Sequence, residues 1–312
     1  MMRKEFVVLS EYDGLPLQGV VYEPNEKPRG IVQLVHGMVE YKKRYEPFMQ
    51  FLAERGYVAA CHDHRGHGDS VATEEDRGWF GDRTSKAIVN DCAQVTKYLK
   101  TQYPDLPVTL FGHSMGSMVV RCYLHENDGL IDKLIVCGSP SYNPMAGTAV
   151  LLAKTMRLFR GERHRSKTLN YLATGKGSEE FVKAGKGSWL TRDEEIVRAY
   201  HENPKCRFVF TVNGFENLFN LMKYTYKKSA YKVQNPALPI HFIAGSDDVV
   251  IVSPEKWEKA VEFIRKVGYP NVTRKLYPDM RHELLNEIGR EEVYADVLEF
   301  IEKEPFAQKF DT

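Results

Sequence analysis

The sequence is poor in cysteine and has no long apolar run. Five cysteines occur among 312 residues, scattered and without a CxxC pair: Cys61, Cys92, Cys122, Cys137 and Cys206. This odd set predicts reduced, buried thiols rather than a disulfide framework or a metal site. No segment approaches the roughly 20 apolar residues that cross a bilayer. The N-terminus also lacks the long apolar region and cleavage site of a signal peptide. We therefore expect a cytoplasmic protein with no transmembrane segment.

The chain also lacks an excess of either charge, with 43 Lys plus Arg against 42 Asp plus Glu. No nucleic-acid-binding motif is present, so no nucleic-acid partner is expected. The charges are nevertheless unevenly placed. Residues 141–236 hold 17 basic and 8 acidic side chains, a net charge of +9, whereas the remainder has a net charge of −8. This basic segment could favour anionic substrates or transient contact with anionic lipid. The alternative is a solvated basic face with no partner.

Short apolar runs alternate with helical stretches through most of the chain. The runs before residue 140 are 31–35, 57–61, 107–111 and 133–138, with helical stretches at 41–55, 84–101 and 115–125. The pattern resumes with apolar runs at 238–245 and 272–277 and helices at 254–267 and 289–304. Because the runs lack polar alternation, they predict a mostly parallel sheet covered by helices on both faces, the doubly wound α/β class. The sequence before residue 30 could add a leading antiparallel hairpin.

Between residues 141 and 236 the alternation stops. About 95 residues are too many for a loop, and the segment contains helical stretches of its own. We therefore predict a core of residues 1–140 and 237–312 and an inserted cap of residues 141–236. Seven apolar cap residues could line a tunnel, although such spacing more often marks the cap's own core, and none is assigned a substrate role: Met145, Leu152, Met156, Phe208, Phe210, Phe215 and Phe219.

The strongest chemical signal is Gly112-His-Ser114-Met-Gly116. It follows a predicted strand and opens a predicted helix, which is the context of the G-x-S-x-G nucleophile elbow of the α/β-hydrolase fold. The glycines relieve crowding in a strained turn that lifts the serine hydroxyl above the sheet. Ser114 is therefore the predicted nucleophile.

A serine needs a base and an orienting acid, which follow it in this fold in the order Ser, Asp, His. His282 follows the predicted strand 272–277 and is the candidate base. The strand 238–245 leads into Asp247 and Asp248, and only one of them can face the histidine. Asp248 is favoured, which leaves Asp247 as a solvated or turn residue. Asp279 lies too close to His282 in sequence to be its partner and is interpreted as a turn residue.

An oxyanion hole needs two backbone N–H donors, one after the nucleophile and one after the third strand. Met115 is the candidate for the first. Met38, which ends the His36-Gly37-Met38 turn, is the candidate for the second.

Two further patterns resemble metal motifs but are incomplete. His62, His64 and His67 have an HxHxxH spacing, but Gly66 stands where binuclear zinc hydrolases have aspartate. The HExxH-like start at His282 fails because Asn286 replaces the second histidine. We predict no metal and no cofactor.

Taken together, the motifs are similar to those of the α/β-hydrolases grouped as lysophospholipases and monoacylglycerol lipases, a serine-aminopeptidase-like (S33) branch. The resemblance covers nearly the whole chain and is carried by these segments: HGMVEYKKRY (36–45), DHRGHGDS (63–70), GHSMG (112–116), SWLTRDEE and NPKCRF in the predicted cap, GSDDVV (245–250) and MRHELLNE (280–287). It implies Asp248 as the acid, Met38 and Met115 as oxyanion donors, and a cap that shapes an acyl-chain site. Tyr41 departs from the histidine often found there, which could alter the mouth of the pocket.

The expected activity is hydrolysis of an acyl ester, most simply monoacylglycerol or lysophospholipid, through an acyl-enzyme on Ser114. Two alternatives use the same triad: an aminopeptidase, for which relatives usually have tryptophan after the serine where this chain has Met115, and a short-chain esterase. A non-catalytic ligand-binding protein on this scaffold is the alternative from another class.

Overall fold

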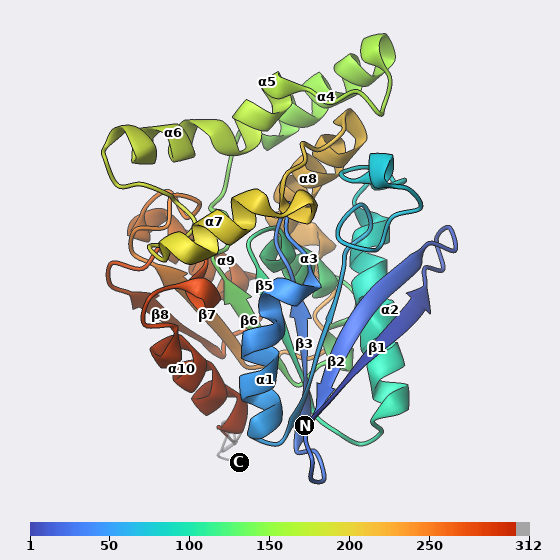
Figure 1. Ribbon diagram of the computed structural model, residues 1–312, viewed down its shortest axis with the longest axis vertical. Coiled ribbons are helices and arrows are strands. Elements are labelled where there is room, and N and C mark those ends of the chain that lie inside the picture. Colours follow the sequence, from blue (N-terminus) through green and yellow to red (C-terminus); the bar gives the residue numbers. More distant parts are fainter. Residues whose placement is uncertain (304–312) are drawn as a thin grey trace.

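An eight-stranded, mostly parallel sheet forms the centre of the structure, a computed structural model that describes residues 1–303 apart from the side chain of residue 176 (Figure 1). The strand order is β1-β2-β4-β3-β5-β6-β7-β8, with these bounds: β1 Met2–Leu9, β2 Pro16–Glu23, β3 Gly30–Val35, β4 Tyr57–His62, β5 Val108–His113, β6 Lys133–Cys137, β7 Ile240–Gly245 and β8 Val272–Tyr277. Strands β3 to β6 are almost wholly buried, which explains why the sequence shows apolar runs without alternation. The predicted doubly wound α/β class is confirmed.

The predicted N-terminal hairpin is also confirmed. Strand β1 pairs antiparallel with β2, and β2 pairs antiparallel with β4, whereas the strands from β4 to β8 are parallel. Strand β2 is buried along most of its length, but β1 is exposed at most positions, as an edge strand covered on one side only.

Helices cover both faces of the sheet. Helices α1 (Glu46–Glu54) and α10 (Arg290–Glu302) lie on one face, and α2 (Lys86–Gln102), α3 (Met115–Tyr123) and α9 (Pro254–Val267) lie on the other (Figure 1). Each face has its own apolar core. The predicted helix at 41–55 is interrupted: a 3-10 turn occupies Lys42–Tyr45, and α1 starts at Glu46 with Pro47 in its first turn.

The segment between β6 and β7 contains five α-helices: α4 Ala146–Arg160, α5 Lys167–Asn170, α6 Lys176–Lys183, α7 Glu194–Glu202 and α8 Val212–Thr225. Helices α4, α5 and α6 lie above the carboxyl ends of the strands (Figure 1). Helix α8 is buried between α4 and α3, and its Asn213 and Asn217 side chains bond the backbone at residues 80–85. This part of the predicted cap is therefore packed into the main apolar core.

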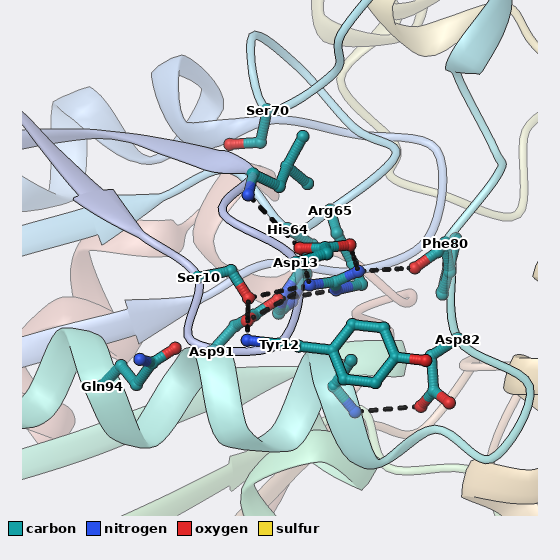
Figure 2. A network of polar contacts seen from close by, with 12 residues as sticks. Ser10, Tyr12, Asp13, His64, Arg65, Ser70, Phe80, Asp82, Asp91 and Gln94 are labelled. Carbon is teal, nitrogen blue, oxygen red and sulfur yellow. Dashed lines mark hydrogen bonds and ion pairs between the residues drawn. The ribbon is translucent and has the colours of Figure 1, made fainter.

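A buried polar network joins the N-terminal hairpin to the rest of the core (Figure 2). The Arg65 guanidinium forms ion pairs with Asp91 at 2.7 Å and with Asp13 at 2.9 Å, and also donates to the Phe80 carbonyl and the Ser10 hydroxyl. Arg65 is 1% exposed, so its charge is stable there only because these acceptors surround it. The network fixes the start of the loop that follows β4.

All five cysteines are buried and unpaired, as predicted. Among the helices within residues 1–303, none is long and apolar enough to cross a membrane.

Candidate active site

Ser114 occupies a strained turn between β5 and α3. Its φ and ψ angles are 54° and −116°, outside the helical and extended regions, and its backbone N–H donates to the Cys137 carbonyl at 2.9 Å. A side chain at Gly116 would place its Cβ 2.1 Å from the Val35 carbonyl oxygen, and one at Gly112 would lie 2.5 Å from the Gly116 oxygen. The turn therefore closes only with glycine at both positions, as the sequence predicts for an elbow.

The structure brings Asp248 and His282 together from the ends of β7 and β8. His282 Nδ1 donates to both carboxylate oxygens of Asp248 at 2.9 Å, and both side chains are buried. Asp248 Oδ1 also accepts from the Val250 N–H at 2.8 Å, which fixes the carboxylate. A carboxylate bonded to Nδ1 leaves Nε2 of the imidazole as the atom that can accept a proton.

Asp247 faces away from this pair. Its carboxylate lies 3.3 Å from Lys186 Nζ and is partly exposed, and its N–H donates to the Met280 carbonyl. Asp279 has a positive φ of 57° and donates its N–H to the Ser246 hydroxyl, which is turn geometry.

Ser114, His282, Met38 and Met115 line one cavity of about 590 Å³. Most of its remaining wall is apolar and includes Met118, Leu172, Phe208, Leu218, Met222 and Val252. Of the seven apolar cap residues considered as tunnel candidates, Phe208 alone is among the lining residues. Phe210, Phe215 and Phe219 are instead fully buried in the core, and Met145 and Leu152 are exposed.

The two candidate oxyanion donors approach the serine from different loops. Gly37 is so close that a Cβ there would lie 3.1 Å from the Ser114 Cβ, which places the Met38 turn beside the elbow. Met115 is the first residue of α3, where an N–H has no partner within the helix. Within residues 1–303, neither the Met38 nor the Met115 amide is bonded to a protein acceptor.

A buried charged network that the sequence did not predict supports the loops that bear Met38 and Ser114. His113 donates from Nδ1 to Glu40 at 3.1 Å and from Nε2 to the His282 carbonyl at 3.1 Å, while Tyr45 donates to Glu40. Burial disfavours the charged forms of both His113 and Glu40. The hydrogen bond to Glu40 and its negative charge nevertheless raise the pKa of His113. In turn, the hydrogen bond to His113 and the charges of His113 and Arg44 lower the pKa of Glu40 to about 2. Glu40 and Tyr45 belong to the HGMVEYKKRY motif and His113 to the GHSMG motif, so these side chains were visible in the sequence, but nothing in either motif shows that they pair.

Glu283, next to the candidate base, belongs to the same network. Its carboxylate forms a bidentate ion pair with Arg44 at 2.6 and 2.7 Å, and Arg44 also pairs with Glu40 at 3.0 Å. The loop that bears His282 is thereby tied to the loop that bears Met38.

His62 at the end of β4 and His64 and His67 in the loop after it form a cluster of packed rings with His36, which follows β3. His64 donates its N–H to His36 Nε2 at 2.9 Å and bonds the His36 carbonyl through its own Nε2 at 3.0 Å. Burial lowers the pKa of His62 and His67 to about 4 and keeps those of His36 and His64 well below the ordinary value. The rings of His64 and His67 therefore hold His36, the residue that precedes Gly37 and Met38. No cluster with metal-ligand geometry occurs in the described part of the chain.

Tyr41 is not among the residues that line the cavity. Its hydroxyl accepts a bond from Asn203 Nδ2 at 2.8 Å, and Lys205 lies over its ring. The residue that departs from the motif therefore links the loop after β3 to the segment between β6 and β7.

Comparison with known proteins gives consistent matches. Residues 26–289 match the family described as "Serine aminopeptidase, S33". Mouse monoglyceride lipase is 32% identical over 296 residues, which are 89% of this chain and 86% of the relative. Monoacylglycerol lipase from Mycolicibacterium smegmatis is 26% identical, over 90% and 91% of the two chains. A thermostable carboxyl esterase from Bacillus coagulans, solved with glycerol, has 30% identity and a TM-score of 0.86, over 96% and 98% of the chains. These likenesses confirm the α/β-hydrolase fold predicted from the sequence.

Proposed function

This chain belongs to the serine aminopeptidase S33 family of α/β-hydrolases, and we propose that it cleaves lipid acyl esters with Ser114, His282 and Asp248 as a catalytic triad. It is a carboxylic ester hydrolase of the serine type. The observation that carries the proposal is a single cavity in which the strained serine, the aspartate-bonded histidine and two unpaired amides meet beneath an apolar wall.

The proposed reaction has two acyl-transfer steps. Ser114 Oγ attacks the ester carbonyl while His282 Nε2 takes its proton, and the Met38 and Met115 amides stabilise the oxyanion. His282 then protonates the departing alcohol oxygen, leaving the acyl group on Ser114. Water, deprotonated by His282, attacks the acyl-enzyme and releases the carboxylic acid. Asp248 keeps the Nδ1 proton in place and stabilises the imidazolium in both steps.

The cavity wall supports an acyl chain as the group bound beside the serine. Its apolar side chains come from α3, the loop between β7 and α9, and the segment between β6 and β7. Burying each methylene of a chain is worth about 0.8 kcal/mol, so a long acyl group should bind better than a short one. Monoacylglycerol and lysophospholipid are substrates of this kind, and the names of the two lipase relatives also suggest monoacylglycerol.

An aminopeptidase activity is less well supported. Recognition of a free amino terminus needs a carboxylate that faces the substrate. Two carboxylates are among the residues lining the cavity, Glu40 and Glu283. Glu40 is already paired with His113 and Arg44, and Glu283 is already paired with Arg44.

An ester panel tests the substrate class. We expect kcat/KM to rise at least tenfold from p-nitrophenyl acetate to p-nitrophenyl decanoate, and monoacylglycerol and lysophospholipid to be hydrolysed faster than alanyl-p-nitroanilide. A maximum at the acetyl ester would instead indicate a short-chain esterase. Preferential cleavage of the anilide would support the peptidase.

We further propose that α4 docks on an anionic lipid surface. Its underside, with Val150 and Ala153, packs on the core, whereas Leu158 is 77% and Phe159 82% exposed. Leu151 and Leu152 lie one heptad earlier and are also exposed, so the four side chains share one broad face. The exposed Lys154 and Arg160 flank it, and the surrounding segment 141–236 has a net charge of +9. An apolar stripe with basic flanks is the pattern of a helix that lies in a membrane interface.

The double variant Leu158→Ser/Phe159→Ser should bind vesicles of phosphatidylglycerol and phosphatidylcholine at least tenfold more weakly in a sedimentation assay. Hydrolysis of vesicle-embedded monoacylglycerol should fall in parallel, while that of soluble p-nitrophenyl butyrate should not change. Val7→Ser/Leu9→Ser, which removes exposed apolar side chains from β1, is the matched control. Unchanged vesicle binding by the α4 variant would contradict the docking proposal. If vesicle binding by the wild-type protein did not weaken as salt is added, the basic residues would have no part in docking.

A further inference from the structure

Two aromatic rings pack against the imidazole of His282. One is His113, with ring centroids 4.7 Å apart and an interplanar angle of 45°. The other is Trp189, at 5.2 Å and 36°. His113 is held by Glu40 and belongs to the core, but Trp189 comes from the predicted cap, between α6 and α7. Trp189 is partly buried and lines the same cavity as Ser114.

The backbone around Trp189 is fastened to the loop that bears His282. Arg281 Nη1 donates to the Ser188 carbonyl at 2.7 Å and to the Thr191 carbonyl at 3.1 Å. The Glu283 N–H donates to the Leu190 carbonyl at 2.8 Å. These bonds come from the residues on either side of His282, so the segment that bears Trp189 and the loop that bears His282 are held together by hydrogen bonds.

A second set of hydrogen bonds joins residues 191 and 192 to the end of the same loop, at residues 286 and 287. The buried Glu287 carboxylate accepts from the Arg192 N–H at 3.1 Å and from Arg192 Nε at 3.0 Å, and it also accepts from the Arg281 N–H at 3.0 Å. Thr191 Oγ1 donates to the Asn286 carbonyl at 3.0 Å. Residues 188–192 are therefore anchored, in contrast to the exposed helices above them.

We propose that Trp189 is a positioning residue for the catalytic base: its anchored indole holds the His282 imidazole in place and stabilises the imidazolium formed when His282 takes the Ser114 proton. This inference rests on the function proposed above, in which His282 is the base. The indole face carries negative electrostatic potential, so it attracts the ring more strongly once the ring is positively charged. That gain arises in the transition state rather than on substrate binding, so it should affect kcat more than KM.

The test compares Trp189→Leu, Trp189→Met and Trp189→Phe with p-nitrophenyl butyrate, a short substrate that depends little on the acyl wall. We expect the two non-aromatic variants to lose about tenfold in kcat with KM within about twofold of wild type. Trp189→Phe should keep most of the activity because it retains a π face. Thermal unfolding shows whether each variant is folded. If either Trp189→Leu or Trp189→Met fails to fold, the other still tests the role of the aromatic ring.

Trp79→Leu is the matched control. Trp79 is also partly buried and carries a cation on its face, Arg163 at 4.2 Å, but it does not line the cavity, so its loss should leave kcat unchanged. A folded non-aromatic Trp189 variant with wild-type kcat would overturn the positioning role, as would a Trp189→Phe variant as slow as Trp189→Leu. Ser114→Ala separates the two proposals. If that variant keeps full activity the triad itself is wrong, whereas if it is inactive a null result at Trp189 removes only the present inference.

Discussion

Replacing Ser114 with alanine should abolish ester hydrolysis, with kcat for p-nitrophenyl esters falling by about a millionfold. The physical reason is that the acyl-enzyme cannot form without the hydroxyl, and only the oxyanion donors and the binding cavity remain to assist attack by water. The measurement is steady-state hydrolysis at high enzyme concentration, together with labelling by a fluorophosphonate probe, which should disappear.

The substitution should not unfold the protein. The bonds made by Ser114 involve its backbone: its N–H donates to Cys137, and its carbonyl accepts from Ser117. Alanine meets the same steric demands as serine at φ 54°, so no strain is added. Ser178→Ala is the control, because that hydroxyl bonds only to the backbone of its own helical segment. Hydrolysis that persists in Ser114→Ala would contradict the assignment of the nucleophile, and a non-catalytic homologue would show neither hydrolysis nor labelling in the wild type.

Asp248→Asn should lower kcat by about 10⁴-fold with little change in KM. An asparagine of the same size can present its amide N–H to Nδ1, which places the ring proton on Nε2 and leaves that atom unable to act as a base. The bond from the Val250 N–H to the side-chain oxygen can persist, so the loop should keep its position. The measurement is kcat and KM for p-nitrophenyl butyrate, with thermal unfolding to verify the fold.

The neighbouring residue provides the matched control for this prediction. Asp247→Asn makes the same replacement of one carboxylate oxygen by an amide NH2, but that group faces Lys186 and solvent rather than His282. Its kcat should stay within about twofold of wild type. If the large loss followed Asp247→Asn instead, the acid of the triad would have to be reassigned. If both variants retained full activity, neither the Asp247 nor the Asp248 carboxylate would have a part in the reaction.

The sequence predicted the framework of this site because its determinants are local. An apolar run ending in Gly112-His-Ser114-Met-Gly116 can close only as a tight strand-to-helix turn, and the structure shows that the two glycines leave no room for a Cβ. Because β7 and β8 are parallel neighbours, Asp248 and His282 leave the sheet at the same edge. The choice between Asp247 and Asp248 was less secure, because successive residues differ only in the direction that the turn gives each side chain.

The sequence could not predict the surroundings of His282, because they depend on contacts between distant segments. Glu40 reaches His113 across 73 positions, and Arg44 reaches Glu283 across 239. Neither pairing leaves a pattern in either segment alone. The same holds for the apolar candidates in the cap, where Phe208 and Phe210 differ by two positions yet one lines the cavity and the other lies in the core.

By itself, the sequence determined the sheet class, the elbow and the order of the triad candidates, because periodicity and turn chemistry act over a few residues. The tertiary structure alone decided which side chains form the cavity wall and that Trp189 lies against His282. Those outcomes depend on how residues 188–192 are bonded to residues 281–287, an arrangement set by packing and buried hydrogen bonds between segments some 90 positions apart.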